Sequence, residues 1–172
     1  MDYIHHVDSP LGGITLASDG EAIIGLWFDG QQYFGSTLDA VHEERQLPVF
    51  DEAGRWLRIY FSGKDPGFLP PLRMRAGAFR KEVWEILLTI PHGQTMTYGH
   101  IAGLLAEKAG RNHMSAQAVG GAVGHNAISL MIPCHRVIGS DGSLTGYAGG
   151  IDRKRSLLRL EQEGILPGIM RE

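Results

Sequence analysis

The sequence predicts an α/β N-terminal domain, with a small antiparallel sheet plus one helix, followed by a mostly α C-terminal domain that contains a helix-turn-helix. Residues 3–30 alternate apolar and polar side chains between turn signals, whereas the second half carries apolar side chains at helical spacing. Between them lies "GKDPGFLPPLR", residues 63–73, whose Gly and Pro content is typical of a linker. The charge also changes there, because residues 1–75 carry 6 basic and 11 acidic side chains and residues 76–172 carry 10 and 8. We therefore predict domains at 1–75 and 76–172.

The N-terminal elements follow from turn signals and periodicity. Residues 3–30 are expected to form an antiparallel meander of about three strands. Its turn signals are Ser9-Pro10, Gly12-Gly13, Asp19-Gly20 and Asp29-Gly30. Phe50, Leu57 and Tyr60 recur at helical spacing, which predicts a helix over residues 50–62 that stops at Gly63.

The C-terminal half is predicted to be mostly helical. In residues 78–91 apolar side chains line one helix face, and Pro91 ends that helix. Thr97 is placed to cap a short helix that stops at Gly110, and Ser115 to cap another that runs to about Gly124. Two short helices with a tight connection predict a helix-turn-helix.

The last third of the chain is expected to hold a strand and a helix. Residues 129–139, "SLMIPCHRVIG", form an apolar run typical of a strand, with Pro133 suited only to an edge or an irregular end. Residues 151–164 predict an amphipathic helix with Asp152 in its first turn and Gly164 at its end.

The segment "AVGGAVG", residues 118–124, is unusual for a helix, because each glycine costs about 1 kcal/mol relative to alanine. Close packing against another helix is one explanation. The other is a smooth surface that lets the helix backbone approach a ligand such as a DNA groove. The sequence alone leaves both open.

The composition restricts the class of protein. A hydrophobic share of 43% and a charged share of 20% are typical of a soluble globular protein, and no run of about 18 apolar residues could span a bilayer. The start "MDYIHHVDSP" does not resemble a signal peptide, and a single cysteine cannot form an internal disulfide, so we expect a cytoplasmic protein. The net charge of −3 argues mildly against a nucleic-acid partner. If the protein binds DNA, we expect the second half of the chain to do so, because basic side chains are in excess there.

The single cysteine, Cys134, lies between a proline and a histidine. Taken alone, such a cysteine is more often a buried small hydrophobe than a nucleophile. His135 adjoins it, however, and Glu161 shares a helix face with Leu157 and Leu158, so this carboxylate is expected to point inward and to need a partner. If Glu161 holds His135, and His135 takes the thiol proton through a water, the set is an activated thiolate.

The segment "PCHRVIG", residues 133–139, with "GHN" upstream and "GSLTGYAGGIDRKRSLLRLE" downstream, resembles the O6-alkylguanine-DNA alkyltransferases, also called methylated-DNA–protein-cysteine methyltransferases. The resemblance covers about residues 77–165 and extends less distinctly to the N-terminal domain, which in this family has a small RNase H-like fold. It implies DNA repair by irreversible transfer of an alkyl group from O6-alkylguanine, or O4-alkylthymine, to the protein, after the base has flipped out of the duplex.

The resemblance also implies roles for individual residues. Cys134 is the expected alkyl acceptor, His135 its base through a water, and Glu161 the group that orients the imidazole. Asn126 resembles the asparagine that ties the helix-turn-helix to the active-site strand. Tyr147 resembles the tyrosine that donates a hydrogen bond to the leaving guanine, whose developing charge needs a donor.

The expected base pocket consists of the backbone carbonyls of Cys134 and Val137, the amide of Ala148, and Lys154 near the active-site loop. The expected DNA contacts are Tyr98, Ser115, Gln117, Ala118, Gly121 and Arg136. Gln117 stands where the family often has an arginine that fills the gap left by the flipped base, so we expect weaker DNA affinity and a smaller dependence on salt. Ala148 stands where some members have serine.

Other functions remain as alternatives. The first is a non-catalytic helix-turn-helix protein that binds alkylated DNA, although such relatives lack the acceptor cysteine. A thiol hydrolase would need an oxyanion hole that the sequence does not indicate, and His113 and His125 lack ligand-like spacing around Cys134 for a metal. We therefore expect no cofactor or metal, a monomer, and double-stranded DNA containing O6-alkylguanine as partner, with no membrane association.

Overall fold

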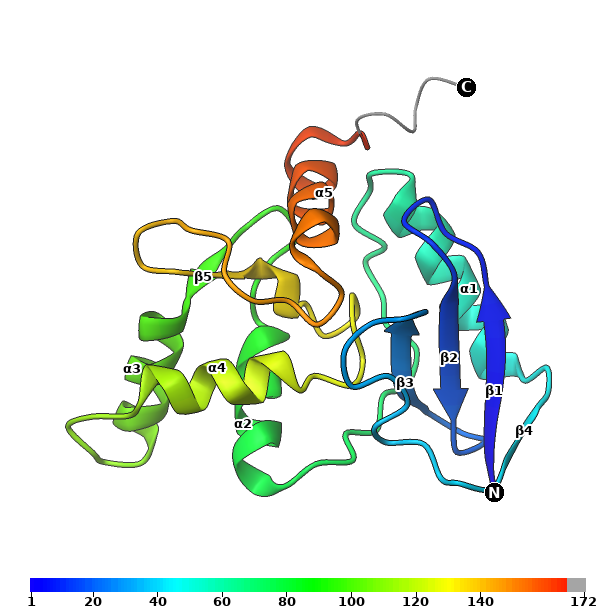
Figure 1. Cartoon of the computed structure of the whole chain (residues 1–172), viewed down its shortest axis with the longest axis horizontal. Coiled ribbons are helices and arrows are strands. Elements are labelled where there is room, and N and C mark those ends of the chain that lie inside the picture. Colours follow the sequence, from blue (N-terminus) through cyan, green and yellow to red (C-terminus); the bar gives the residue numbers. More distant parts are fainter. Residues whose placement is uncertain (167–172) are drawn as a thin grey trace.

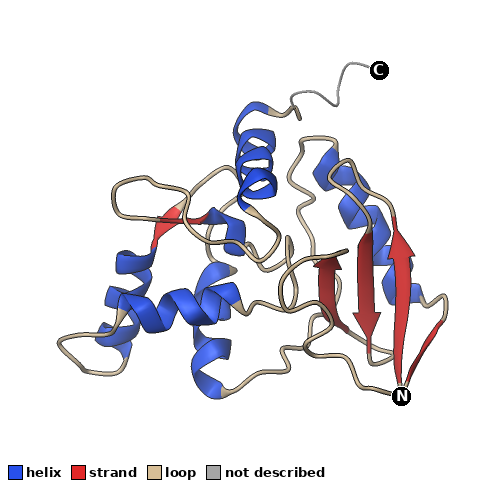
Figure 2. Cartoon of the chain, viewed as in Figure 1, coloured by secondary structure: helices blue, strands red, loops and turns tan. Residues whose placement is uncertain are grey.

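The structure of the chain is a computed structural model that describes residues 1–166; residues 167–172, at the end of the predicted C-terminal domain, lie outside the described part (Figures 1 and 2). Its N-terminal part is a sheet of β1 (Asp2–Val7), β2 (Ile14–Ser18), β3 (Ile23–Phe28) and β4 (His42–Glu44), in the order β3-β2-β1-β4. The first three strands pair antiparallel, as the alternation predicts. Strand β4 pairs parallel to β1 and was not predicted, because its three residues are all exposed and carry no apolar pattern.

Helix α1 (Pro48–Phe61) packs along the sheet (Figure 1). It begins two residues before the predicted start, because Pro48 occupies the first turn, where its missing N–H leaves no hydrogen bond unmade. Its buried side chains are Val49, Phe50, Ala53, Trp56, Leu57 and Tyr60. The small α/β domain of the sequence prediction is confirmed.

The C-terminal part is mostly helical (Figure 2). Its elements are α2 (Ala78–Leu87), β5 (Met96–Thr97), α3 (Tyr98–Lys108), α4 (Ala116–Gly124), the 3₁₀ turn η1 (Cys134–Arg136), β6 (Val137–Ile138) and α5 (Ile151–Glu163). Both predicted caps are present: the Thr97 side chain accepts a hydrogen bond from the His100 amide, and that of Ser115 from the Ala118 amide. Helices α3 and α4 pack on each other, and both contact α2.

The predicted strand over residues 129–139 is wrong. Only Val137 and Ile138 form a strand, which pairs in parallel with Met96–Thr97. Before them the backbone turns back on itself: the Met131 amide donates to the Ser129 carbonyl and the Cys134 amide to the Ile132 carbonyl. The apolar run is buried because this irregular chain passes through the core, so its hydrophobicity reports burial and not a sheet ladder.

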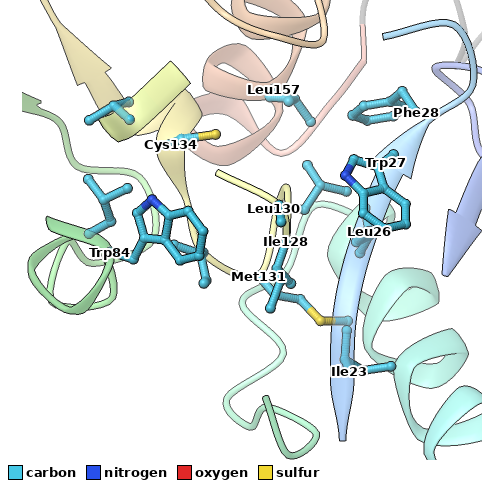
Figure 3. Packing of buried hydrophobic residues seen from close by; sticks show 14 of the residues in the cluster. Ile23, Leu26, Trp27, Phe28, Trp84, Ile128, Leu130, Met131, Cys134 and Leu157 are labelled. Carbon is cyan, nitrogen blue, oxygen red and sulfur yellow. The ribbon is translucent and has the colours of Figure 1, made fainter. Parts of the chain in front are cut away.

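The edge of β3 joins the two halves of the chain. The Ile23 amide donates to the Pro71 carbonyl at 2.8 Å, so the linker predicted at residues 63–73 runs along this edge. Further along, the Leu26 amide donates to the Ala127 carbonyl, and its carbonyl accepts from the Ser129 amide. Figure 3 shows the side chains of Leu26 and Ile128 within one cluster of buried residues that also contains Cys134. The segment that leads to the cysteine is therefore anchored on the N-terminal sheet.

No helix within residues 1–166 is both long enough and apolar enough to cross a membrane.

A substitution at Gly25 in β3 tests how tightly the core packs around Trp27. A methyl group at this position would overlap the ring of Trp27, which is fully buried. We expect Gly25→Ala to lower the free energy of unfolding by about 1–3 kcal/mol, because overpacking displaces a ring that has nowhere to go. Urea-induced unfolding measures it.

The matched control is Gly103→Ala, on the exposed side of α3, where a methyl group meets nothing within 4 Å. It should raise the stability by up to about 1 kcal/mol through helix propensity. Equal effects at the two positions would contradict the packing described for β3.

Candidate active site

Cys134 is the first residue of the 3₁₀ turn and belongs to the hydrophobic core, where its side chain projects near Leu157 of α5 (Figure 3). It is only 4% exposed. Burial raises the pKa of the thiol to about 11, although a hydrogen bond from Asn126 and the positive charge of Lys154 oppose this shift. The resting cysteine is therefore a protonated thiol, and its activation requires a base.

His135 and Glu161 form a buried pair. The His135 Nε2 lies 2.5 Å from the Glu161 Oε2, and both side chains are fully buried. Burial lowers the pKa of His135, although the Glu161 carboxylate opposes this shift, so the imidazole is neutral at rest. Because Nε2 faces the carboxylate, it carries the proton, and Nδ1, which has no hydrogen-bond partner in the described part of the chain, keeps its lone pair.

Glu161 accepts hydrogen bonds from several segments of the chain. Arg136 donates from Nε at 2.7 Å and from a terminal nitrogen at 3.1 Å, and the Gly93 amide donates at 3.1 Å. The Tyr60 hydroxyl donates to Oε2 at 2.6 Å. Burial would raise the pKa of Glu161, but the hydrogen bonds from His135 and Arg136 and the positive charge of Arg136 outweigh it and hold the pKa well below its usual range.

The expectation that Arg136 contacts DNA was wrong. Its guanidinium is buried, with the side chain 10% exposed, and it donates to both oxygens of Glu161 and to the Ile90 carbonyl at 2.6 Å. A buried guanidinium needs such partners, since an unpaired charge in the interior is costly. Arg136 therefore secures Glu161 from inside the protein.

Asn126 lies just after α4, where the resemblance places its linking asparagine. Its Oδ1 accepts a hydrogen bond from the Ile128 amide at 3.0 Å, and its Nδ2 donates to the Ile132 carbonyl at 2.7 Å. These bonds connect the end of α4 with the chain that leads to Cys134.

The segment 145–150 carries Tyr147 and is held in place by hydrogen bonds from Lys154 of α5. The buried Lys154 Nζ donates to the Thr145 carbonyl at 2.9 Å and to the Gly146 carbonyl at 3.3 Å, and burial lowers the pKa of this lysine to about 8. The Tyr147 hydroxyl is buried without a hydrogen-bond partner in the described part of the chain. Burial, together with the nearby Cys134, raises the pKa of Tyr147 well above its usual value. This phenol is therefore neutral and can donate a hydrogen bond to a further acceptor.

A cavity of about 170 Å³ opens between α4 and this segment. Its walls include Tyr98, Gly120, Gly121, Gly124, Tyr147 and Ala148. A methyl group at Gly121 or Gly124 would meet nothing within 4 Å, so close helix packing does not explain these glycines. Because these glycines have no side chains, the cavity is open toward α4. This favours the second explanation of residues 118–124, that a smooth surface lets the helix backbone approach a ligand.

The other expected residues lie around the cavity or beside it. Ser115, Gln117, Ala118 and Gly121 are exposed on α4, and the Tyr98 hydroxyl donates to the Thr145 carbonyl at 3.2 Å. Val137 is fully buried in β6. The described residues contain no cluster of His, Cys, Asp and Glu that could hold a metal.

Several residues of this site were missed from the sequence. Tyr60 was assigned to the core by its helical spacing, which carries no signal for a contact with Glu161 at a separation of 101 residues. Gln32 and Tyr33 line the cavity from the N-terminal part, and the Gln32 amide donates to the Ala148 carbonyl at 3.0 Å. These contacts depend on how the two parts pack, which no local pattern reveals.

The protonation state of Cys134 can be tested by its rate of labelling with iodoacetamide as a function of pH. With a thiol pKa of about 11, the logarithm of the rate in the native protein should rise with unit slope through pH 10. In the denatured chain it should level off above about pH 8.5. The slope does not depend on access to the buried thiol; a native profile that levels off near neutrality would mean a resting thiolate.

Comparison with known proteins places this geometry in a family. Residues 3–74 match the ribonuclease-like domain of 6-O-methylguanine DNA methyltransferase, and residues 78–163 match its DNA binding domain. A Mycobacterium tuberculosis protein named methylated-DNA–protein-cysteine methyltransferase is 43% identical over 162 residues, which cover 94% of this chain and 93% of the relative. A Haemophilus influenzae protein of the same name is 38% identical over 161 residues, 93% of this chain and 86% of the relative.

The fold agrees with solved structures. The structure of Mycobacterium tuberculosis OGT in complex with DNA has a TM-score of 0.81 and 40% sequence identity, and the match covers 96% of each chain. The matches to proteins of this one family thus cover both halves of the chain and almost its whole length. The chain belongs to the 6-O-methylguanine DNA methyltransferase family.

Proposed function

We propose that this protein repairs DNA by transferring the alkyl group of O6-alkylguanine to Cys134, and that each molecule acts once, as a monomer. The observation that carries the proposal is the buried Cys134 thiol, followed in sequence by the His135–Glu161 pair, with the ring of Tyr147 6.4 Å from the His135 imidazole. A thiol, a base with a free nitrogen and a phenol without a partner are the three groups that such a transfer needs.

The chemistry begins with the thiol proton. His135 takes it at Nδ1 through a bridging water, while Glu161 balances the charge of the imidazolium. The thiolate attacks the alkyl carbon in line with the bond to O6, so a carbon–sulfur bond forms as the carbon–oxygen bond breaks. The electron pair of the broken bond stays on the guanine, where a hydrogen bond from the Tyr147 hydroxyl stabilises it.

The product explains the single turnover. A thioether has no ready leaving group and no proton to lose, so Cys134 cannot be regenerated by the same groups. The guanine anion takes up one proton, which balances the proton that the thiol gave to His135, and the unmodified guanine returns to the duplex; the protein has been consumed as the second substrate.

DNA binding is assigned to α4 and its surroundings. The target atom is inaccessible in a duplex, so the nucleotide must leave the stack at a cost of a few kcal/mol. The glycine face of α4 lets the backbone approach the groove, Tyr98 crowds the target phosphate, and Gln117 occupies the gap opposite the orphaned cytosine. The cavity beside the helix, whose wall includes Ala148, would then be where the base enters. The carbonyls of Cys134 and Val137 do not line this cavity, so the base would have to pass further inward for them to face its edge.

A protein that binds alkylated DNA without reacting is the second candidate. It is not favoured, since the curated relatives that match almost the whole chain are named as methyltransferases and Cys134 is present with its histidine.

Transfer to Cys134 is tested by the intact mass of the protein after incubation with a duplex that carries one O6-methylguanine. The wild type should gain one methylene equivalent, and Cys134→Ser should gain nothing while still binding the duplex. An unchanged wild-type mass with tight binding would support the non-catalytic candidate, whereas no gain and no binding would refute both.

The proposed base cavity is tested by Gly121→Leu. The first carbon of the leucine side chain would meet nothing within 4 Å, and the rest of the side chain has the adjoining cavity to occupy. We expect normal thermal stability and a single-turnover transfer rate at least ~100-fold lower, since the base can no longer reach a reactive position. Gly103→Leu, another open helical glycine, is the matched control and should react normally. A normal rate in Gly121→Leu would mean that the base enters elsewhere.

A further inference from the structure

Tyr60 brings the N-terminal domain into direct contact with the reactive pair. It lies in α1, is fully buried, and its hydroxyl donates to the Glu161 Oε2 at 2.6 Å. The same oxygen atom of Tyr60 lies 3.3 Å from the His135 Nε2. Tyr60, Glu161 and the imidazole therefore form one compact cluster in which two side chains approach the same carboxylate oxygen.

The Tyr60 hydroxyl is held in place by the packing of its ring. Trp56 stacks on it, with ring centroids 5.0 Å apart and planes inclined by 8°, and Phe61 contacts it edge-on at 5.3 Å. Burial and the negative charge of Glu161 raise the pKa of Tyr60 well above its usual value, so the group stays a neutral donor. A fixed, neutral donor costs little reorganisation when charge develops nearby.

Removing this donor would change the proton affinity of His135. Each hydrogen bond that Glu161 accepts stabilises its negative charge and weakens its pull on the imidazolium. The ionisable groups in and around the cluster are Tyr60 on α1, His92 after α2, Cys134, His135 and Arg136 on the 3₁₀ turn, Tyr147 on the active-site segment, and Lys154 and Glu161 on α5. Among them Tyr60 is the neutral donor that contacts both members of the pair.

We propose that Tyr60 is a positioning residue for the alkyl transfer: its hydroxyl orients Glu161 and weakens the hold of His135 on its proton, in addition to the effect of burial. The inference rests on the proposed function, because it assigns a part of that reaction to the N-terminal domain. The domain then contributes to chemistry as well as to the core.

The test is the single-turnover rate of methyl transfer from an O6-methylguanine duplex as a function of pH. In Tyr60→Phe the ring remains and only the hydroxyl is lost. His135 should then bind its proton more tightly, so the acid limb of the profile should move up by about half to one pH unit. The plateau rate should fall by about tenfold through poorer orientation, with the half-saturating DNA concentration unchanged.

Two further variants separate this role from a structural one. Trp56→Phe removes buried apolar area but keeps an aromatic ring against Tyr60 and keeps the hydroxyl, so it should lose stability and retain the wild-type pH profile. A ring-fluorinated tyrosine at position 60 is a stronger donor and should move the acid limb down, in the opposite direction to Tyr60→Phe. It also keeps the test decisive if Tyr60→Phe folds poorly.

The outcomes separate a failure of the proposed function from a failure of the role proposed for Tyr60. If the wild type gains no methyl group, the proposed function itself is wrong. If the wild type reacts and neither Tyr60→Phe nor the fluorinated protein shifts the acid limb, Tyr60 is merely a core residue and this inference is overturned.

Discussion

The rest of the structure depends on the buried carboxylate of Glu161. It accepts hydrogen bonds from Tyr60 on α1, from the Gly93 amide and from Arg136, and it pairs with His135. Removing one member of a buried ion pair commonly costs about 3–5 kcal/mol, because the remaining charge is left without a partner. One side chain on the last helix thus holds together the first helix, the chain after α2 and the reactive turn.

In the proposed transfer, this arrangement accounts for how a buried cysteine could react. Burial makes the thiol a poor acid, with a pKa of about 11, and therefore protects it from adventitious chemistry. The same burial keeps His135 neutral, so a base stands ready beside it. In the proposed transfer, Glu161 would offset the positive charge that His135 gains with the thiol proton, and Arg136 offsets the charge of Glu161 while the thiol is at rest. The low dielectric of the core strengthens each of these interactions.

Local signals in the sequence predicted much of the fold and part of the site. Turn residues and alternation located the three-stranded meander, and the caps at Thr97 and Ser115 are present. The inward position of Glu161 followed from its place beside leucines on one helix face. What was missed depends on contacts between distant segments: Tyr60 was assigned to the core alone, and Arg136 was expected to contact DNA, whereas it pairs with Glu161. The strand expected around Cys134 failed because burial and strand structure give the same apolar run.

At rest, the site holds a protonated thiol beside a neutral imidazole whose proton lies on Nε2, toward Glu161. The most direct measurement is the ¹⁵N chemical shift of the two His135 ring nitrogens in labelled protein at neutral pH. We expect a protonated Nε2 and an unprotonated Nδ1, with Cys134→Ser giving the same pattern. Two protonated nitrogens in the wild type, lost in Cys134→Ser, would show a resting thiolate–imidazolium pair and contradict it.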